Sequence, residues 1–334
     1  MLTEDVIQQW IREIREGRPR ALARAITAIE NGYPGVDALV DALYVQTGRA
    51  WRIGLTGPPG AGKSTLINQL VRYMRTQGKR VGVLAVDPSS PFTGGALLGD
   101  RIRMAETTPD PGVFFRSLAA RGALGGLSEA TEYAADVLDA AGYEVIFMET
   151  VGVGQSEIEV VRAVDTVVVV LVPESGDVIQ TMKAGLMEIG DIFCVNKADH
   201  AEADALVRAL EHMLELRPSR EGWHPPVVKT VATQKDGVRP LVEALEAHRV
   251  FLETSGLWKR YRKERLRRRV EQLVYRTWHR EFWNDTRKAR LQQALEELDR
   301  EAWTPYELAR RIMKMHQTRI ATTETHHSNR EKHG

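Results

Sequence analysis

The chain has 334 residues, with 46 lysines and arginines against 45 aspartates and glutamates, and a formal net charge of +1. A composition that is 43% apolar and 27% charged is ordinary for a globular protein, and it excludes a disordered or collagen-like chain. The balanced charge argues against a dedicated nucleic-acid-binding protein, and the single cysteine, Cys194, excludes an intramolecular disulfide.

The first part of the chain is predicted to be a helical extension. In residues 1–48 apolar side chains recur at three- and four-residue spacing, for example at Val6, Trp10 and Ile14. The N-terminus lacks the basic and apolar regions of a signal peptide, and no apolar run approaches the ~20 residues of a membrane span. We therefore expect a cytoplasmic protein.

The central part, residues 49–252, alternates between apolar strands and amphipathic helices. This alternation predicts an α/β fold with a doubly wound, mostly parallel sheet. The expected strands are residues 51–56, 81–86, 112–117, 144–148, 167–172, 192–195 and 227–231, and the expected helices include 63–77, 127–141, 181–187 and 201–216.

The last part changes character. Residues 253–318 have a helical pattern rich in Arg, Leu and Glu, and Pro305 after Thr304 suits the start of a helix. Residues 319–334 have no apolar period and are predicted to be a disordered tail. The basic run at 259–269 is interpreted as a solvated helix face in preference to a nucleic-acid or membrane surface, since no aromatic stacking platform accompanies it.

A glycine-rich segment after the first strand fits the phosphate-binding pattern G-x-x-x-x-G-K-[ST], in the strand-then-helix context that this motif requires. Its backbone N–H groups and the following helix N-terminus would bind phosphate oxygens. Lys63 would reach the β- and γ-phosphates, Ser64 would hold Mg²⁺, and Thr65 would cap the helix or contact the α-phosphate. The motif comprises Gly57, Pro58, Pro59, Gly60, Ala61, Gly62, Lys63 and Ser64.

A second motif, N-K-x-D, ends the strand at 192–195. The Asp199 carboxylate could accept hydrogen bonds from both N1–H and the 2-amino group of guanine, a donor pair that adenine lacks. Asn196 would brace the neighbouring loop, and the stem of Lys197 could pack over the base. Together with the phosphate loop, this motif favours GTP over ATP.

Acidic residues at strand ends predict a magnesium site. Glu149 ends the strand at 144–148, where an acid commonly holds Mg²⁺ directly or through water. Asp87 and Asp100 are further candidates, although Asp87 also suits a turn before proline and Asp100 a helix N-cap. After Glu149, the Gly152 N–H could sense the γ-phosphate, and Gln155 is a candidate for orienting the attacking water.

These motifs, together with D-P-S-S-P, G-G-A-L-L-G-D-R-I-R-M and E-T-V-G-V-G-Q-S-E, resemble the MeaB/ArgK-type P-loop GTPases over residues 5–310. That family comprises GTPase chaperones of adenosylcobalamin-dependent acyl-CoA mutases. The resemblance implies that Asp87, Asp100 and Glu149 are metal-site and switch acids, and that Lys183 lies in an extra switch loop. It also implies that Val231, Ala232 and Thr233 form the loop at guanine, where Val231 replaces the usual serine, and that the C-terminal helices form a homodimer.

The resemblance thus predicts a Mg²⁺-dependent GTPase that binds GTP or GDP. Its partner would be methylmalonyl-CoA mutase or a sibling that acts on isobutyryl- or 2-hydroxyisobutyryl-CoA. The GTPase would gate the transfer of the cofactor from a cobalamin adenosyltransferase to this mutase, and it would protect or reactivate the mutase. Adenosylcobalamin would lie on the partner, with no nucleic acid or membrane involved. Two alternatives stay open: a metallochaperone GTPase, for which the sequence lacks ligand spacing, and a kinase linked to amino-acid transport, for which no acceptor pocket is evident.

Overall fold

The computed structural model describes residues 2–88, 110–120, 129–150, 162–173, 185–217, 219, 221–296 and 303–313. The chain divides into two compact units, residues 1–262 and 263–334. The domain boundaries expected from the sequence, near residues 48, 252 and 318, stay predictions.

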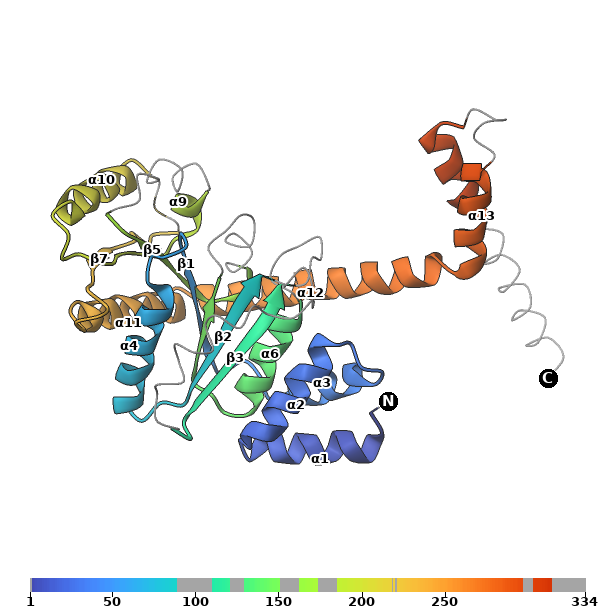
Figure 1. Cartoon of the computed structure of the whole chain (residues 1–334), viewed down its shortest axis with the longest axis horizontal. Coiled ribbons are helices and arrows are strands. Elements are labelled where there is room, and N and C mark those ends of the chain that lie inside the picture. Colours follow the sequence, from blue (N-terminus) through green and yellow to red (C-terminus); the bar gives the residue numbers. More distant parts are fainter. Residues whose placement is uncertain are drawn as a thin grey trace. The chain divides into compact units, whose positions relative to one another are not determined.

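The first unit is built around a seven-stranded sheet in the order β3-β2-β4-β1-β5-β6-β7 (Figure 1). All its registered neighbours are parallel. The strands are β1 (Trp51–Thr56), β2 (Val81–Pro88), β3 (Val113–Ala120), β4 (Val145–Glu149), β5 (Thr166–Leu171), β6 (Ile192–Val195) and β7 (Val227–Lys229). The predicted parallel α/β architecture is confirmed.

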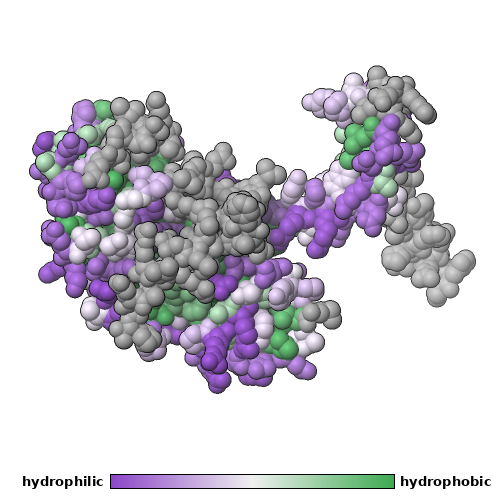
Figure 2. Space-filling view, in the orientation of Figure 1, coloured by the Kyte–Doolittle hydropathy of each residue, from purple (hydrophilic) through white to green (hydrophobic). Residues whose placement is uncertain are grey.

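Helices cover both faces of this sheet, which explains why its strands are almost continuously apolar. Alternate residues point to opposite faces, so Ile53 and Leu55 join one core cluster while Ile146 and Met148 join the other. The first cluster includes α4 (Lys63–Thr76) and α11 (Val238–Thr254). The second includes α6 (Glu129–Ala140) and α10 (Ala203–Glu215). Away from the grey atoms, Figure 2 shows a mostly hydrophilic surface with small apolar patches.

The N-terminal helices belong to the second cluster. They are α1 (Glu4–Arg15), α2 (Pro19–Glu30) and α3 (Val36–Tyr44), and their apolar stripes bury Ile14, Leu22 and Leu39 completely. An ion pair from Glu30 to Arg116 on β3, 2.6 Å long, ties α2 to the edge strand. The extension is therefore part of the covering of the sheet, rather than a separate body.

The second unit is helical in its described part. Helix α12 (Leu257–Phe282) begins in the first unit, and α13 (Asp285–Glu296) follows it. A further helix starts at residue 305, as predicted. Thr304 caps it reciprocally: the Thr304 N–H donates to Glu307 Oε2 at 3.1 Å, and the Glu307 N–H donates to Thr304 Oγ1 at 3.3 Å.

Two expected elements need correction. Strand β7 ends at Lys229 rather than at 231, because the chain turns there and Val231 forms an isolated antiparallel bridge with Asp236. The described part of the helix expected at 181–187 is the short α9 (Leu186–Ile189), and residues 181–184 lie outside the described residues. The predicted tail, 319–334, also lies outside them. No described helix is long and apolar enough to span a membrane.

Candidate functional site

The site lies at the carboxyl ends of the parallel strands, where β1 runs into a tight loop and then into α4. Two positions in that loop accept only glycine. Gly57 has a φ of 139°, and a Cβ there would lie 2.0 Å from the carbonyl oxygen of Val170. Gly62 has a φ of 85°, and a Cβ there would lie 2.4 Å from Asn196 Nδ2. The loop is therefore wedged between β5 and the end of β6.

Lys63, the first residue of α4, folds back over this loop. Its ammonium group donates hydrogen bonds to the carbonyl oxygens of Gly57 at 2.8 Å and Pro58 at 3.1 Å, and the residue is only 6% exposed. These bonds offset the desolvation of a nearly buried charge. The cation and the N-terminus of α4 together form a positive centre suited to phosphate.

A hydroxyl and a carboxylate meet beside Lys63. Ser64 Oγ donates to Glu149 Oε1 at 2.7 Å, and Glu149 is a buried residue at the end of β4. In the neighbouring strand Ala85 pairs with Glu149, which places Asp87 two residues farther toward the same edge. Hydroxyl and carboxylate oxygens are ligands that Mg²⁺ prefers, so Ser64 and Glu149 together fit this ion. Within the described residues, no group of three or more His, Cys, Asp or Glu side chains is placed to hold a metal.

Asn196 connects three segments behind the pocket. Its Nδ2 donates to the carbonyl oxygen of Ala61 at 2.8 Å. Its Oδ1 accepts from the Thr230 hydroxyl at 3.0 Å and from the Ala232 N–H at 3.1 Å. All the polar atoms of the buried Asn196 amide thus serve to hold the phosphate loop against the loop after β7.

A buried thiol lies behind this connection. Cys194 Sγ is 3.2 Å from Thr230 Oγ1, and the cysteine is completely buried in β6. Burial raises the pKa of the Cys194 thiol to about 12, because the thiolate would lose its hydration. The thiol is therefore a neutral packing group at ordinary pH.

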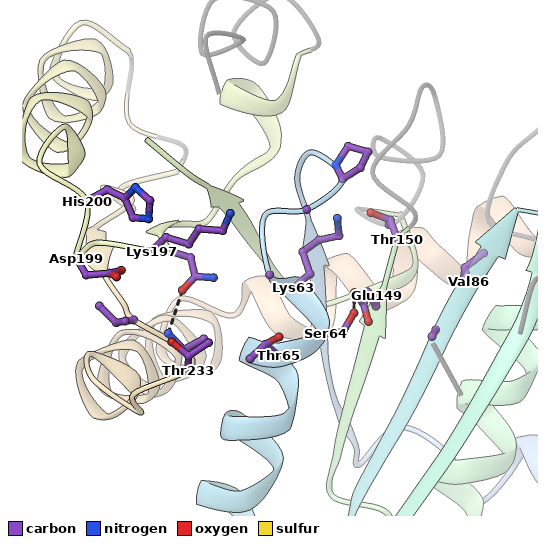
Figure 3. A pocket seen from close by; sticks show the side chains of 17 residues that line it. Lys63, Ser64, Thr65, Val86, Glu149, Thr150, Lys197, Asp199, His200 and Thr233 are labelled. Carbon is purple, nitrogen blue, oxygen red and sulfur yellow. Dashed lines mark hydrogen bonds between the residues drawn. The ribbon is translucent and has the colours of Figure 1, made fainter. Parts of the chain in front are cut away.

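The turn after β6 presents the remaining side chains. Lys197 has a φ of 55°, and its carbonyl oxygen accepts from the His200 N–H at 3.1 Å. The Ala198 N–H donates to the Thr230 carbonyl at 3.0 Å, which holds the turn against the loop after β7. Figure 3 shows Lys197, Asp199 and His200 at one end of the pocket and Lys63, Ser64 and Glu149 at the other.

The pocket itself encloses about 500 Å³, within the range of small-ligand sites. Most of the candidate residues line it: Pro59, Gly60, Gly62, Lys63, Ser64, Thr65, Glu149, Asn196, Lys197, Asp199, Val231, Ala232 and Thr233. The loop residues Gly57, Pro58 and Ala61 support them from behind through the bonds given above.

Some candidates and some lining residues differ from the sequence prediction. Asp100, Gly152, Gln155 and Lys183 lie outside the described residues, and of Asp87 only the backbone position is described. Ala85, Val86, Thr150 and His200 line the pocket but were not predicted. His200 could have been found from its place directly after N-K-A-D, whereas nothing in the sequence around Val86 marks it.

A parallel sheet whose central strand enters a glycine-rich loop and then a helix defines the P-loop NTPase fold. The family model described as "Methylmalonyl Co-A mutase-associated GTPase MeaB" matches residues 22–287, and the chain belongs to this family. It is a GTPase.

The names of individual relatives are consistent with this family. A Pyrococcus abyssi protein that carries a GTPase name is 52% identical over 272 residues, which cover 80% of this chain and 84% of that protein. The Escherichia coli GTPase ArgK is 37% identical over 287 residues, covering 82% of this chain and 86% of ArgK. A solved structure titled as a LAO/AO transport system kinase superposes with a TM-score of 0.69 at 29% identity, covering 95% of this chain and 99% of that one.

Proposed function

We propose that this GTPase is a Mg²⁺-dependent G-protein chaperone of an adenosylcobalamin-dependent acyl-CoA mutase. The partner would be methylmalonyl-CoA mutase or its isobutyryl- or 2-hydroxyisobutyryl-CoA sibling. The observation that carries this proposal is the match over residues 22–287 to a family described by its association with methylmalonyl-CoA mutase. In this role the chain would gate cofactor loading from the adenosyltransferase and protect or reactivate the mutase.

GTP would lie along the pocket with its phosphates at the loop and its base at the turn after β6. The separation of the positive centre at Lys63 from the carboxylate of Asp199 supports this orientation (Figure 3). Asp199 would accept from the N1–H and the 2-amino group of guanine. The Ala232 N–H is engaged by Asn196, and the Val231 N–H donates to the Asp236 carbonyl at 3.1 Å. Contacts from that loop to the base would therefore come from the side chains of Val231, Ala232 and Thr233.

Mg²⁺ would be held by Ser64 and Glu149, with Asp87 and Asp100 acting directly or through water. When bound, the ion neutralises charge on the β- and γ-phosphates. Ser64 would then turn its hydroxyl oxygen from Glu149 toward the ion, and Lys63 would exchange the carbonyls of Gly57 and Pro58 for phosphate oxygens. Gln155 would orient the attacking water, and the segments at Gly152 and Lys183 would report hydrolysis to the mutase.

A homodimer would form through the second unit. Helix α12 exposes an apolar stripe at four-residue spacing, formed by Leu266, Val270, Val274 and Trp278, whose exposed fractions run from 42% to 62%. Burial of such a stripe against a second copy is favourable. We expect Val270→Glu combined with Val274→Glu to give a monomer by light scattering, while Gln272→Glu on the opposite side leaves the dimer intact. A monomeric wild-type chain would contradict this arrangement.

The deciding experiment measures complex formation with purified candidate mutases in the presence of GDP, a non-hydrolysable GTP analogue or no nucleotide. We expect nucleotide to change the affinity, and Lys63→Ala to abolish that dependence. Equal affinity in all three states for every candidate mutase would overturn the chaperone proposal. A parallel assay with labelled GTP and amino-acid acceptors separates a GTPase, which releases only free phosphate, from a kinase.

A further inference from the structure

We propose that His200 contacts the ring of the bound guanine by stacking, and so determines nucleotide affinity independently of the hydrogen-bonding edge read by Asp199. This inference rests on the proposed placement of guanine nucleotide in the pocket. It adds a residue and a type of contact that the N-K-x-D motif does not contain.

The first observation is the position of the side chain. His200 lines the pocket, and Figure 3 shows its ring beside the side chains of Asp199 and Lys197, at the end remote from Lys63. The residue is exposed, so its side chain is not enclosed by the protein. Asp199 is expected to bind the edge of the base, and the His200 ring lies next to it. The ring is therefore within reach of the base.

The second observation is the rigidity of the backbone that carries the ring. The His200 N–H donates to the Lys197 carbonyl at 3.1 Å, and the His200 carbonyl accepts from the Ala203 N–H at 3.0 Å, near the start of α10. Both backbone polar groups of His200 are therefore fixed. A contact made by a ring on such a backbone costs little ordering entropy when the nucleotide binds.

The third observation concerns the chemistry of the pocket. Among the described residues that line it, His200 is the only one with an aromatic ring. A purine held by its edge still presents two flat faces, and proteins satisfy such faces with aromatic rings, histidine included. The aliphatic stem of Lys197 can cover part of the base, as long cationic side chains do, while His200 supplies a π surface.

The test compares two nucleotides that differ at the edge but not in the ring system. Inosine diphosphate lacks the 2-amino group of GDP, so a contact to the edge discriminates between them whereas a stacking contact does not. Affinities are measured by calorimetry on the full chain at fixed Mg²⁺ and ionic strength. The variants are His200→Ala, His200→Phe, His200→Gln and the matched control His212→Ala, which removes another exposed histidine from α10.

We expect His200→Ala to weaken GDP and inosine diphosphate by the same factor, about tenfold. His200→Phe should restore both affinities to within about twofold, and His200→Gln and His212→Ala should behave as alanine and wild type, respectively. Three results would overturn the inference: wild-type affinity in His200→Ala, a loss confined to GDP, or restoration by glutamine but not by phenylalanine.

The failure of this inference differs from failure of the proposed site. If Lys63→Ala and Asp199→Asn both bind GDP as the wild type does, the nucleotide is not in this pocket, and the proposed placement fails. If those two variants lose GDP affinity while His200→Ala does not, the placement stands and only the stacking contact is wrong.

Discussion

The amide nitrogen of Asn196 donates to the carbonyl oxygen of Ala61 at 2.8 Å, which joins the end of β6 to the phosphate loop across 135 residues of sequence. The same side chain holds Thr230 and Ala232 through its oxygen. One buried amide therefore sets the distance between the two ends of the pocket, where phosphate and base are expected to bind.

Replacing the Asn196 amide should reduce the magnitude of the free energy of nucleotide binding more than it lowers the free energy of unfolding. Asn196→Ala removes three hydrogen bonds and leaves the buried Thr230 hydroxyl and Ala232 N–H without this acceptor. We expect GDP affinity to fall roughly 30-fold, or about 2 kcal/mol, as measured by calorimetry. Asn196→Asp keeps the acceptor but sets an oxygen against the Ala61 carbonyl, so it should also lose affinity. Wild-type affinity in Asn196→Asp would show that the bond to Ala61 is unimportant.

The sequence predicts the strands, the helices and the phosphate loop better than it predicts the contacts between them. The apolar runs at Trp51 and Val145 identify buried strands because both faces of the sheet are covered, and the spacing from Gly57 to Ser64 identifies the phosphate loop. The bond from Thr230 to Asn196 is not predictable in detail, since it depends on the register of β6 against β7, where Cys194 pairs with Val228. Likewise, the amphipathic stripes of α1 to α3 show that they pack, but do not specify α6 as the partner.

A second group of long-range contacts lies near the amino end of the central strand β1, and it should control stability rather than binding. Arg52 on β1 is 5% exposed and donates to Asp136 on α6 at 2.6 Å, with Asp139 at 3.8 Å. Removal of the Arg52 guanidinium leaves the buried carboxylates of Asp136 and Asp139 without this positive charge beside them. We expect Arg52→Ala to lower the free energy of unfolding by about 3–5 kcal/mol, as measured by urea titration.

The control is an exposed ion pair in the same unit. Arg239 pairs with Glu243 one turn away on α11, and both side chains are largely exposed. Arg239→Ala should therefore change stability by no more than about 0.5 kcal/mol. Equal losses in the two variants would show that burial of Arg52 does not determine the effect.

Alkaline pH should destabilise the fold through Cys194. Burial raises the pKa of this thiol from 9.0 to about 12, so between these values the unfolded chain loses a proton that the folded chain keeps. The contribution is therefore fully present below pH 9.0 and is lost as the pH rises toward about 12. Wild type should lose up to about 1.4 kcal/mol per pH unit more than Cys194→Ala in this range. Parallel stability curves for the two chains between pH 9.5 and about 11 would contradict this prediction.

The bond from Ser64 to Glu149 allows the metal proposal to be tested by variants that differ only slightly in shape. Ser64→Ala removes a proposed ligand and the 2.7 Å bond to Glu149, while Glu149→Gln keeps an oxygen acceptor for Ser64 but removes the charge. If both residues bind Mg²⁺, each variant should slow GTP hydrolysis at least about 100-fold, because charge on the phosphates is no longer neutralised. Excess Mg²⁺ should partly rescue Glu149→Gln, since the remaining ligands still bind weakly. The measurement is phosphate release over a Mg²⁺ titration, with His212→Ala on α10 as a control outside the residues that line the pocket. A Mg²⁺ requirement unchanged in both variants would place the ion elsewhere.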